Sequence, residues 1–375
     1  MASLILFSLP IEACTTGLAA GGATADSRCL LWKNRDSGNR NNEMVFLDQG
    51  EFKLIGVINA DDTTQIWAGV NNFGFAIMNA EARDMAFPEE KTLYDEEGYF
   101  MKAALLSCRS VADFELLLQQ TNSVGRGVTS NFGVIDASGV AAFFETGNHE
   151  YFRFDASDSQ ICPTAFIARA NFAENGYNEE AYGHGRFQNA ADLANAQARV
   201  NKLSPEYLIT HVTRDISTID HTAPDTTLFY TGGTVNRHRT VSCSIFESVL
   251  SGENPLLTTY WITLGEPAVS VAVPLWVLAG EVPDEMDGAG AAPLNLLFQE
   301  LKAYVYPDTA RAQYINAFRL AQVQKQTDKI QKWVFKKTAK QLRKWRKTAP
   351  SAVEVAAFQE KIIAEVMKKL ERIKL

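Results

Sequence analysis

Cys14 is the residue whose type and position best suit chemistry, because it follows the small residue Ala13 where a leading segment could be cleaved. Cleavage there would place a thiol and an α-amine on one residue. An α-amine has a pKa of about 7.7–8.0, so at neutral pH it can take the thiol proton directly or through water. Such a nucleophile needs no histidine. The five histidines of the chain fall in no ligand or catalytic pattern: His149, His184, His211, His221 and His238.

Three other roles compete for Cys14. The thiol could be a buried structural group, or it could form half of a disulfide. Cys14 could also be the lipidated cysteine of a bacterial lipoprotein, given Ile11 and Ala13 ahead of it, although Glu12 fits that signal poorly and lipidation would block the amine. The chain has five cysteines, and an odd number in an exported protein calls for a separate role for one of them. Residue spacing by itself does not decide among these roles.

Other common catalytic and cofactor signatures are missing from the sequence. There is no GxSxG elbow, no Walker loop, no GxGxxG after a strand, no HExxH and no CxxC. We therefore expect neither a cofactor nor a metal site. With a net charge of −8, nucleic acid is also not expected as the main partner.

The charge is unevenly distributed along the chain. Residues 301–375 hold 18 Lys and Arg against 6 Asp and Glu, a net charge of +12, so the preceding 300 residues carry a net charge of −20. A basic tail on an acidic body favours a clamp that lies on the body, in the same chain or across a homo-oligomer. The alternatives are attachment to an anionic membrane or cell-surface polymer, nucleic-acid binding, and a role in solubility alone.

The first thirteen residues resemble the end of a secretory signal peptide. They contain a short apolar run and a small residue before Cys14, but they lack a basic leading region. We expect residues 1–13 to be removed and the protein to be exported to the periplasm or outside the cell. If these residues instead form a first strand, the protein is cytoplasmic. No apolar stretch reaches the length of about 20 residues that a membrane-spanning helix needs.

Short apolar runs separated by turn signals predict antiparallel strands along most of the chain. The pattern predicts strands at 14–19, 29–34, 44–47, 52–59, 65–70, 75–79, 130–136, 140–145, 151–154, 164–169, 227–230, 240–246, 258–264 and 269–273. It predicts helices from about 94 to 108 and at 111–120, 178–202, 205–214, 322–346 and 351–375. Strands and helices alternate in blocks, which is typical of α+β layers. We expect a catalytic domain at 14–290 and a basic helical extension at 291–375.

Four segments carry a resemblance to a known family in the same order. They are CTTGLAAGGATADSRCLLWKNRD, WAGVNNFGFAIMNAE, NFGVIDASGVAAFFET and AFIARANF, within residues 14–280. The sequence resembles the N-terminal-nucleophile (Ntn) cysteine hydrolases, which include penicillin V acylase, choloylglycine hydrolase, acid ceramidase and, with the closest match, the isopenicillin N acyltransferase group. This resemblance implies a four-layer αββα sandwich of antiparallel sheets, with Cys14 at the start of a central strand.

The resemblance implies a role for one residue at a time. Cys14 matches the nucleophile, and Asp36 matches the carboxylate that holds the α-amine and orients the thiol. The family has Arg-x-x-Asp where this chain has Lys33-Asn34-Arg35-Asp36. Lys33 therefore stands at the arginine position and Arg35 lies two residues on. An ammonium cannot grip a carboxylate in bidentate fashion, so either Lys33 supplies charge alone or Arg35 takes over the role.

Three more residues match positions of the same family. Asn79 and Asn171 match asparagines that donate to the oxyanion, although Phe172 stands where the family has His or Tyr. Arg186 matches an arginine that organises the site. Together these residues imply that Cys14 attacks the carbonyl of a small-molecule N-acyl amide and that water hydrolyses the acyl-enzyme. The alternatives are acyl transfer to an amine acceptor and a non-catalytic binding protein on the same scaffold.

The other four cysteines could form two disulfides or stay as buried thiols.

Overall fold

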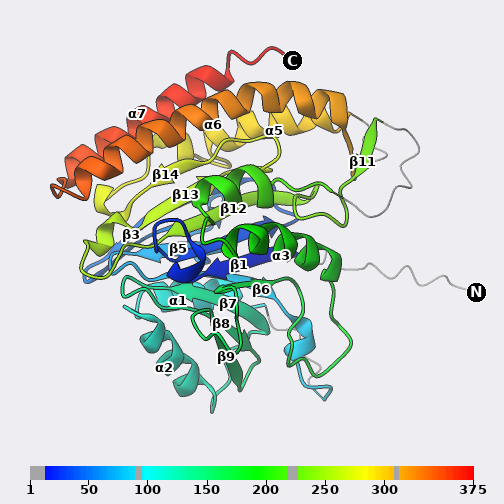
Figure 1. The fold of residues 1–375 in the computed structure, drawn as a ribbon, viewed down its shortest axis with the longest axis vertical. Coiled ribbons are helices and arrows are strands. Elements are labelled where there is room, and N and C mark those ends of the chain that lie inside the picture. The colour runs from blue at the N-terminus through cyan, green and yellow to red at the C-terminus, as the bar shows by residue number, and fades with distance from the viewer. Residues whose placement is uncertain (1–12, 90–94, 218–226, 308–311) are drawn as a thin grey trace, which may run out of the picture.

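The computed structural model describes residues 13–89, 95–217, 227–307 and 312–375. The predicted signal segment therefore lies, apart from Ala13, outside the described residues. Two antiparallel sheets form the centre of the molecule (Figure 1). The six-stranded sheet has the order β10-β1-β2-β12-β13-β14 and the seven-stranded sheet runs β3 to β9 in sequence order.

The strands of the six-stranded sheet are β1 (Cys14–Ala19), β2 (Leu30–Asp36), β10 (Phe166–Arg169), β12 (Thr240–Glu247), β13 (Thr259–Thr263) and β14 (Val273–Leu275). Those of the seven-stranded sheet are β3 (Asn42–Gln49), β4 (Phe52–Asn59), β5 (Ala68–Asn71), β6 (Ala76–Glu81), β7 (Ser130–Ile135), β8 (Ala141–Thr146) and β9 (Tyr151–Asp155). A two-stranded ribbon joins β11 (Leu228–Tyr230) to β15 (Tyr314–Asn316). All these pairings are antiparallel, as the alternation of short strands predicts.

The two sheets pack face to face, with β1 and β2 against β6 and β7. Leu31, Met78 and Phe143 meet at Gly133 between the sheets, where an added Cβ would lie 2.3 Å from the Met78 methyl carbon. A larger residue at this position would therefore force the ends of the Met78 and Leu31 side chains to shift. This tight contact fixes the spacing between the sheets on which the site is built.

Helices cover the outer face of each sheet. The helices α1 (Glu97–Leu105) and α2 (Val111–Thr121) cover the seven-stranded sheet. Ser110 caps α2 by accepting from the Asp113 N–H, as its position before the helix predicts. The helices over the six-stranded sheet are α3 (His184–Ala198), α4 (Pro205–Tyr207) with a π-helical continuation (Leu208–Val212), α5 (Pro293–Val305), α6 (Ala317–Trp345) and α7 (Ala352–Leu370). The predicted four-layer αββα arrangement is confirmed (Figure 1).

Two predicted elements differ most from the structure, and the short strand β15 was not predicted. The helix expected from residue 178 begins only at His184, because Gly183 adopts a positive φ and the Asn178 side chain donates to the carbonyls of Arg83 and Ala86. The strand predicted at 269–273 lies instead at 273–275, as β14. Residues 268 to 272 are instead held by side chains, with Gln331 of α6 bonding both ways to the backbone of Ala272.

The C-terminal segment lies on the body of the same chain. Phe335 of α6 packs on Trp261, and Trp345 packs edge-on against Trp276. The Arg346 guanidinium lies 3.0 Å from the Glu247 carboxylate. α5, α6 and α7 thus form part of the outer layer over the six-stranded sheet (Figure 1). A domain boundary between residues 290 and 291 stays a prediction.

Candidate active site

Cys14 begins β1, between β10 and β2, and its side chain is buried. Its backbone nitrogen donates to Asn171 Oδ1 at 2.9 Å. Its neighbour Thr15 points toward α3, where Thr15 Oγ1 accepts from Arg186 Nε at 3.2 Å. Because side chains alternate along a strand, the Cys14 side chain points the other way, toward the seven-stranded sheet. The backbone nitrogen of Cys14 thus contacts Asn171, whereas the Cys14 thiol faces the seven-stranded sheet.

Asn171 connects three of the predicted residues. It follows β10, and its Oδ1 accepts from Arg186 Nη2 at 2.8 Å as well as from the Cys14 nitrogen. Its Nδ2 donates to the carbonyl of Glu81 at 2.9 Å. The structure therefore brings Cys14, Asn171 and Arg186 together. These contacts show Asn171 fixing the nitrogen of Cys14, while the expected role as an oxyanion donor stays a prediction.

Asp36 lies at the end of β2 and is held by two residues that the sequence pattern did not identify. Its carboxylate accepts from Arg237 Nη1 at 2.9 Å and from Thr240 Oγ1 at 2.6 Å. Burial lowers the pKa of Arg186, and the nearby charge of Arg237 lowers it further, whereas Asp36 and Cys14 act in the opposite direction. Asp36, Arg186 and Cys14 thus share one electrostatic environment. The predicted grip of Asp36 on the α-amine stays a prediction.

Lys33 and Arg35 lie on the same side of β2, facing the second sheet, and Lys33 meets another predicted residue there. Lys33 Nζ donates to Asn79 Oδ1 at 2.5 Å and to the carbonyl of Trp67 at 3.0 Å. Arg35 Nη1 donates to Asn42 at 2.8 Å, and the guanidinium lies 4.4 Å from the centre of the Trp67 ring. Lys33, and not Arg35, therefore contacts Asn79, while the choice between Lys33 and Arg35 for the expected arginine role stays a prediction.

Asn79 joins this group through its side chain. Its Oδ1 accepts from Lys33, and its Nδ2 donates to Ser130 Oγ at 3.1 Å, which in turn donates to the carbonyl of Ala80. Both ends of the amide are therefore engaged within the protein. The bonds fix the orientation of the Asn79 amide beside the Lys33 ammonium.

A second acidic group, not identified from the sequence, borders the site. Glu81 ends β6, pairs with Arg83 at 2.7 Å and accepts from Tyr182 Oη at 3.1 Å. Burial raises the pKa of Glu81, and burial together with the Glu81 charge raises the pKa of Tyr182. The only sequence signal for this group was the position of Glu81 two residues after Asn79. Tyr182 and Arg237 gave none, because both belong to irregular segments.

The loop that carries Asn171 is tied to the second sheet by buried polar side chains. Glu145 of β8 accepts from Arg169 Nε at 3.0 Å and from the backbone N–H groups of Glu174 and Asn175. Asn131 of β7 donates to the carbonyls on either side of Asn171. Asp84 accepts from the Ala173 N–H at 2.8 Å, and its own pKa is raised by burial to about 6.

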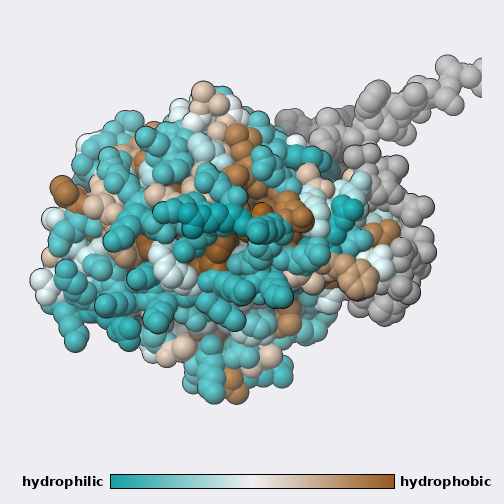
Figure 2. Space-filling view, turned by 90° about the horizontal axis from the view of Figure 1, so that it is seen from above, coloured by the Kyte–Doolittle hydropathy of each residue, from teal (hydrophilic) through white to brown (hydrophobic). Residues whose placement is uncertain are grey.

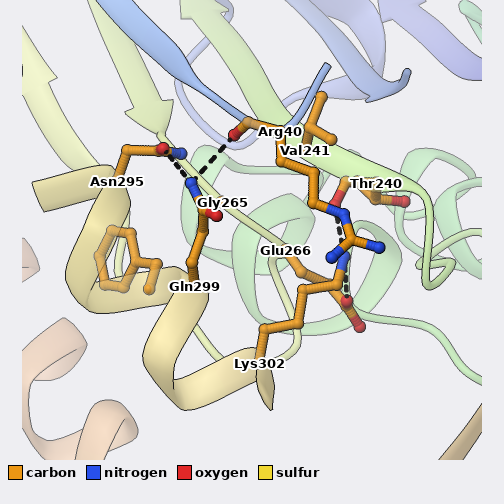
Figure 3. A pocket seen from close by; sticks show the side chains of 9 residues that line it. Arg40, Thr240, Val241, Gly265, Glu266, Asn295, Gln299 and Lys302 are labelled. Carbon is orange, nitrogen blue, oxygen red and sulfur yellow. Dashed lines mark hydrogen bonds and ion pairs between the residues drawn. The ribbon is translucent and has the colours of Figure 1, made fainter. Parts of the chain in front are cut away.

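The C-terminal segment contacts the start of β12, where Thr240 donates to the Asp36 carboxylate. Lys302 of α5 donates to the carbonyl of Thr240 and lies 2.9 Å from the Glu266 carboxylate (Figure 3). It also donates to the carbonyl of His238. Glu266 also accepts from Tyr306 Oη at 2.8 Å. The cavity beside these residues has a volume of about 10 Å³, too small for a ligand. Lys302 therefore supports the backbone beside Thr240.

All five cysteines lie within the described residues, and none of them takes part in a disulfide. Burial raises the pKa of the Cys29 and Cys108 thiols to about 11 and that of Cys243 to about 12. Burial also raises the pKa of Cys162. These four are inert buried thiols in this structure. The described residues contain no group of three or more His, Cys, Asp or Glu placed to hold a metal ion, and none of the described helices could cross a membrane.

Comparison with solved structures finds distant likenesses. No family model matches the chain, and no curated protein matches it. A solved structure of a Caenorhabditis elegans N-acylethanolamine-hydrolyzing acid amidase ortholog is similar with a TM-score of 0.41 and 11% identity over 64% of this chain and 93% of that one. A C2A mutant of conjugated bile acid hydrolase from Clostridium perfringens gives 0.43 and 12% over 73% and 94%. Penicillin V acylase from Agrobacterium tumefaciens gives 0.43 and 11% over 70% and 86%. No residue or activity is carried over from likenesses this distant.

Proposed function

We propose that this protein is an amidohydrolase that cleaves a linear carbon–nitrogen bond of an N-acyl amide, with Cys14 as its N-terminal nucleophile. The observation that carries the proposal is the contact of the Cys14 nitrogen with Asn171 Oδ1, on which Arg186 also converges. While Ala13 precedes it, this nitrogen is a peptide nitrogen and is not basic. Removal of residues 1–13 would convert it into an amine in a position that is already hydrogen-bonded.

In the proposed reaction the α-amine of Cys14 takes the thiol proton and the thiolate attacks the amide carbonyl. Lys33 faces the same side of the sheet as Cys14, and its positive charge favours the thiolate. Asn79 Nδ2 carries two N–H groups, and the one not directed at Ser130 Oγ is the proposed donor to the oxyanion. The α-ammonium then protonates the leaving amine, and water hydrolyses the acyl-enzyme. Asn171 and Arg186 keep the nitrogen in place throughout.

The proposal includes the expected export. Residues 1–13 would be removed on the way to the periplasm or the cell exterior, by a signal peptidase or by self-cleavage. Intact-mass measurement of the purified protein tests this step, since a mature chain that begins at Cys14 with a free amine is required. A retained Met1 or an acylated Cys14 would contradict the mechanism.

Turnover by a Cys14→Ala variant tests the chemistry. The substrates are a panel of N-acyl amides, bile-salt conjugates and penicillin V, which share the linear amide bond. We expect kcat to fall by about 10⁴-fold or more in this variant, because the nucleophile is lost. Cys162→Ala, which removes another buried thiol, is the matched control and keeps its turnover. Unchanged turnover of Cys14→Ala would refute the proposal.

Adding an amine acceptor to the same assay separates the alternatives. A hydrolase releases the free acid at a rate that the acceptor does not raise. An acyltransferase forms the new amide at the expense of the acid. A mature chain that begins at Cys14, binds the amides and turns none of them over would instead be a binding protein on this scaffold.

A further inference from the structure

Six cations form a single line along the exposed side of α6. They are Lys325, Lys329, Lys332, Lys336, Lys340 and Arg343, and all six are exposed. Steps of three or four residues keep side chains on one face of a helix, here within an arc of about 80°. The line extends for about 27 Å at the helical rise. We call these six residues the basic stripe.

The basic stripe lies opposite the face that α6 buries. Val323, Val334 and Trp345 are among the buried residues of the helix, and they stand about half a turn away from the stripe. The apolar face of α6 is therefore already used against the body, and the stripe is what the helix presents outward. Figure 2 looks down on this helical layer and shows hydrophilic residues over most of it, with apolar residues in the hollow between them.

No carboxylate neutralises the basic stripe within the described residues. Asp328 is the sole acidic residue of α6, and it pairs with Arg214 of the body at 2.6 Å. Of the other cations nearby, Lys344 of α6 pairs with Glu354 at 4.0 Å, and Arg346, directly after α6, pairs with Glu247. A helix that is merely solvated alternates its charges, and like charges four residues apart destabilise it. The stripe keeps several such pairs, including Lys325 with Lys329 and Lys336 with Lys340.

We propose that the basic stripe of α6 is a docking surface for an anionic lipid bilayer. Charge complementarity is the first reason, because each lysine near an anionic membrane surface is attracted electrostatically to the lipid headgroups. The second is Phe318, which is 69% exposed and lies seven residues before Lys325, on the same line. An exposed aromatic ring beside lysines suits the boundary between headgroups and acyl chains. The proposal concerns binding and does not depend on the proposed amidase activity.

Composition favours a lipid surface over a linear polyanion. Five of the six stripe residues are lysines, whereas bidentate recognition of backbone phosphates uses arginine. The charge distribution of the whole molecule also predicts how the protein would be oriented on the membrane. The first 300 residues carry a net charge of −20, so an anionic surface repels the body and attracts the helical layer. The protein would then lie with α6 toward the membrane and its sheets away from it.

Co-sedimentation of the full chain with lipid vesicles tests the proposal at about 0.15 M ionic strength. We expect binding to vesicles of equal parts phosphatidylglycerol and phosphatidylcholine and none to phosphatidylcholine alone. The triple variant Lys329→Gln, Lys336→Gln and Lys340→Gln should lose about a hundredfold in partition coefficient. All three residues are exposed, so the unfolding midpoint should not fall.

Two further variants make the test specific. A triple variant of the body, Lys53→Gln, Arg199→Gln and Lys202→Gln, changes the net charge equally and should keep vesicle binding. Phe318→Ser should weaken vesicle binding severalfold without changing any charge. Equal losses in the stripe and body variants would overturn the proposal. It would also be overturned if Phe318→Ser bound like the wild type while double-stranded DNA or polyphosphate displaced the protein from the vesicles, because the partner would then be a polyanion.

Discussion

Arg186 is linked to Cys14, the proposed nucleophile, through another residue. Its guanidinium bonds to Asn171 Oδ1 and to Thr15 Oγ1, and Asn171 Oδ1 receives the Cys14 nitrogen. One planar group thus fixes the side-chain amide and the strand beside the nucleophile. Lysine carries the same charge but has no fork with which to make both bonds in this geometry. Under the proposed function Arg186 is a positioning residue, and we expect its shape to matter as well as its charge.

Replacing Arg186 should lower activity through misplacement of the Cys14 amine. We expect Arg186→Met to reduce kcat about a hundredfold, since a displacement near 1 Å can have that effect, and Arg186→Lys to have a smaller effect. The pH profile of Cys14 alkylation in the mature chain should shift in both variants. Arg199→Met, at the exposed end of the same helix, is the control. An alkylation profile identical to the wild type would show that Arg186 is only structural.

Asp84 gives the stability of the protein a pH dependence. Burial raises its pKa from 3.8 to about 6 in the folded state, so the native state holds the proton more tightly than the unfolded chain. The tighter binding of this proton stabilises the folded state, fully so below about pH 3.8, and the stabilisation is lost as the pH rises through about 6. Asp84→Asn cannot titrate and keeps an acceptor for the Ala173 N–H. Between pH 4 and 7 the wild type should lose about 2 kcal/mol of unfolding free energy relative to the variant.

Denaturant unfolding at a series of pH values measures this difference. Asp158→Asn, which changes an exposed aspartate, is the matched control and should run parallel to the wild type. A constant gap between the wild type and Asp84→Asn across this range would show that Asp84 does not titrate there.

At the scale of elements, the segment between β10 and α3 matters most to the site. Helical periodicity predicts a helix from residue 178, but the chain stays irregular as far as Gly183. Side chains from β7, β8 and the turn at Asp84 take up its backbone groups. Those partners are up to about ninety residues away in the sequence, so local propensity cannot reveal them. The residue they hold in place is Asn171.

Glu145 should prove to be the main support of that segment. Replacing it by glutamine turns one acceptor oxygen into a donor facing the donors at Arg169, Glu174 and Asn175. We expect a loss of about 3 kcal/mol in unfolding free energy, typical of a broken buried ion pair. Hydrogen exchange should speed up at the Glu174 and Asn175 amides.

The same replacement of glutamate by glutamine at a half-buried ion pair is the control. Glu115→Gln weakens the pair with Arg153 and should cost less than about 1 kcal/mol. Unaltered exchange at Glu174 and Asn175 in Glu145→Gln would contradict the role given to Glu145.

For the molecule as a whole, the basic tail is a part of the folded layers. Its aromatic residues cover Trp261 and Trp276, which lie on the outer side of the six-stranded sheet. Lys302 of this tail donates to the carbonyl of Thr240, and the Thr240 hydroxyl donates to the Asp36 carboxylate. The opposite charges of body and tail meet in only a few ion pairs among the described residues, such as Arg346 with Glu247. Apolar packing is therefore the larger part of the attachment.

Removal of the outer helices should destroy the fold. A chain that ends at residue 307 would expose both tryptophans, and we expect it to be insoluble or to lack a cooperative transition, whereas the full chain unfolds in one step. The milder Trp345→Ala should lower the unfolding free energy by about 3–5 kcal/mol, as expected for a large buried aromatic. Phe318→Ala, at an exposed ring of the same helix, is the control. A stable shortened chain with two separate transitions in the full protein would show instead an independent domain.

The sequence by itself determined most of the strands, their antiparallel alternation and the position of Cys14 at the start of one of them, because these depend on neighbours a few residues apart. Only the tertiary structure decided that Asn171 Oδ1 meets the Cys14 nitrogen, that Arg237 holds Asp36, and that Lys33 meets Asn79. The first two of these contacts join residues more than 150 positions apart, and the third depends on how the two sheets pack. Each is set by the packing of layers, which no local pattern encodes.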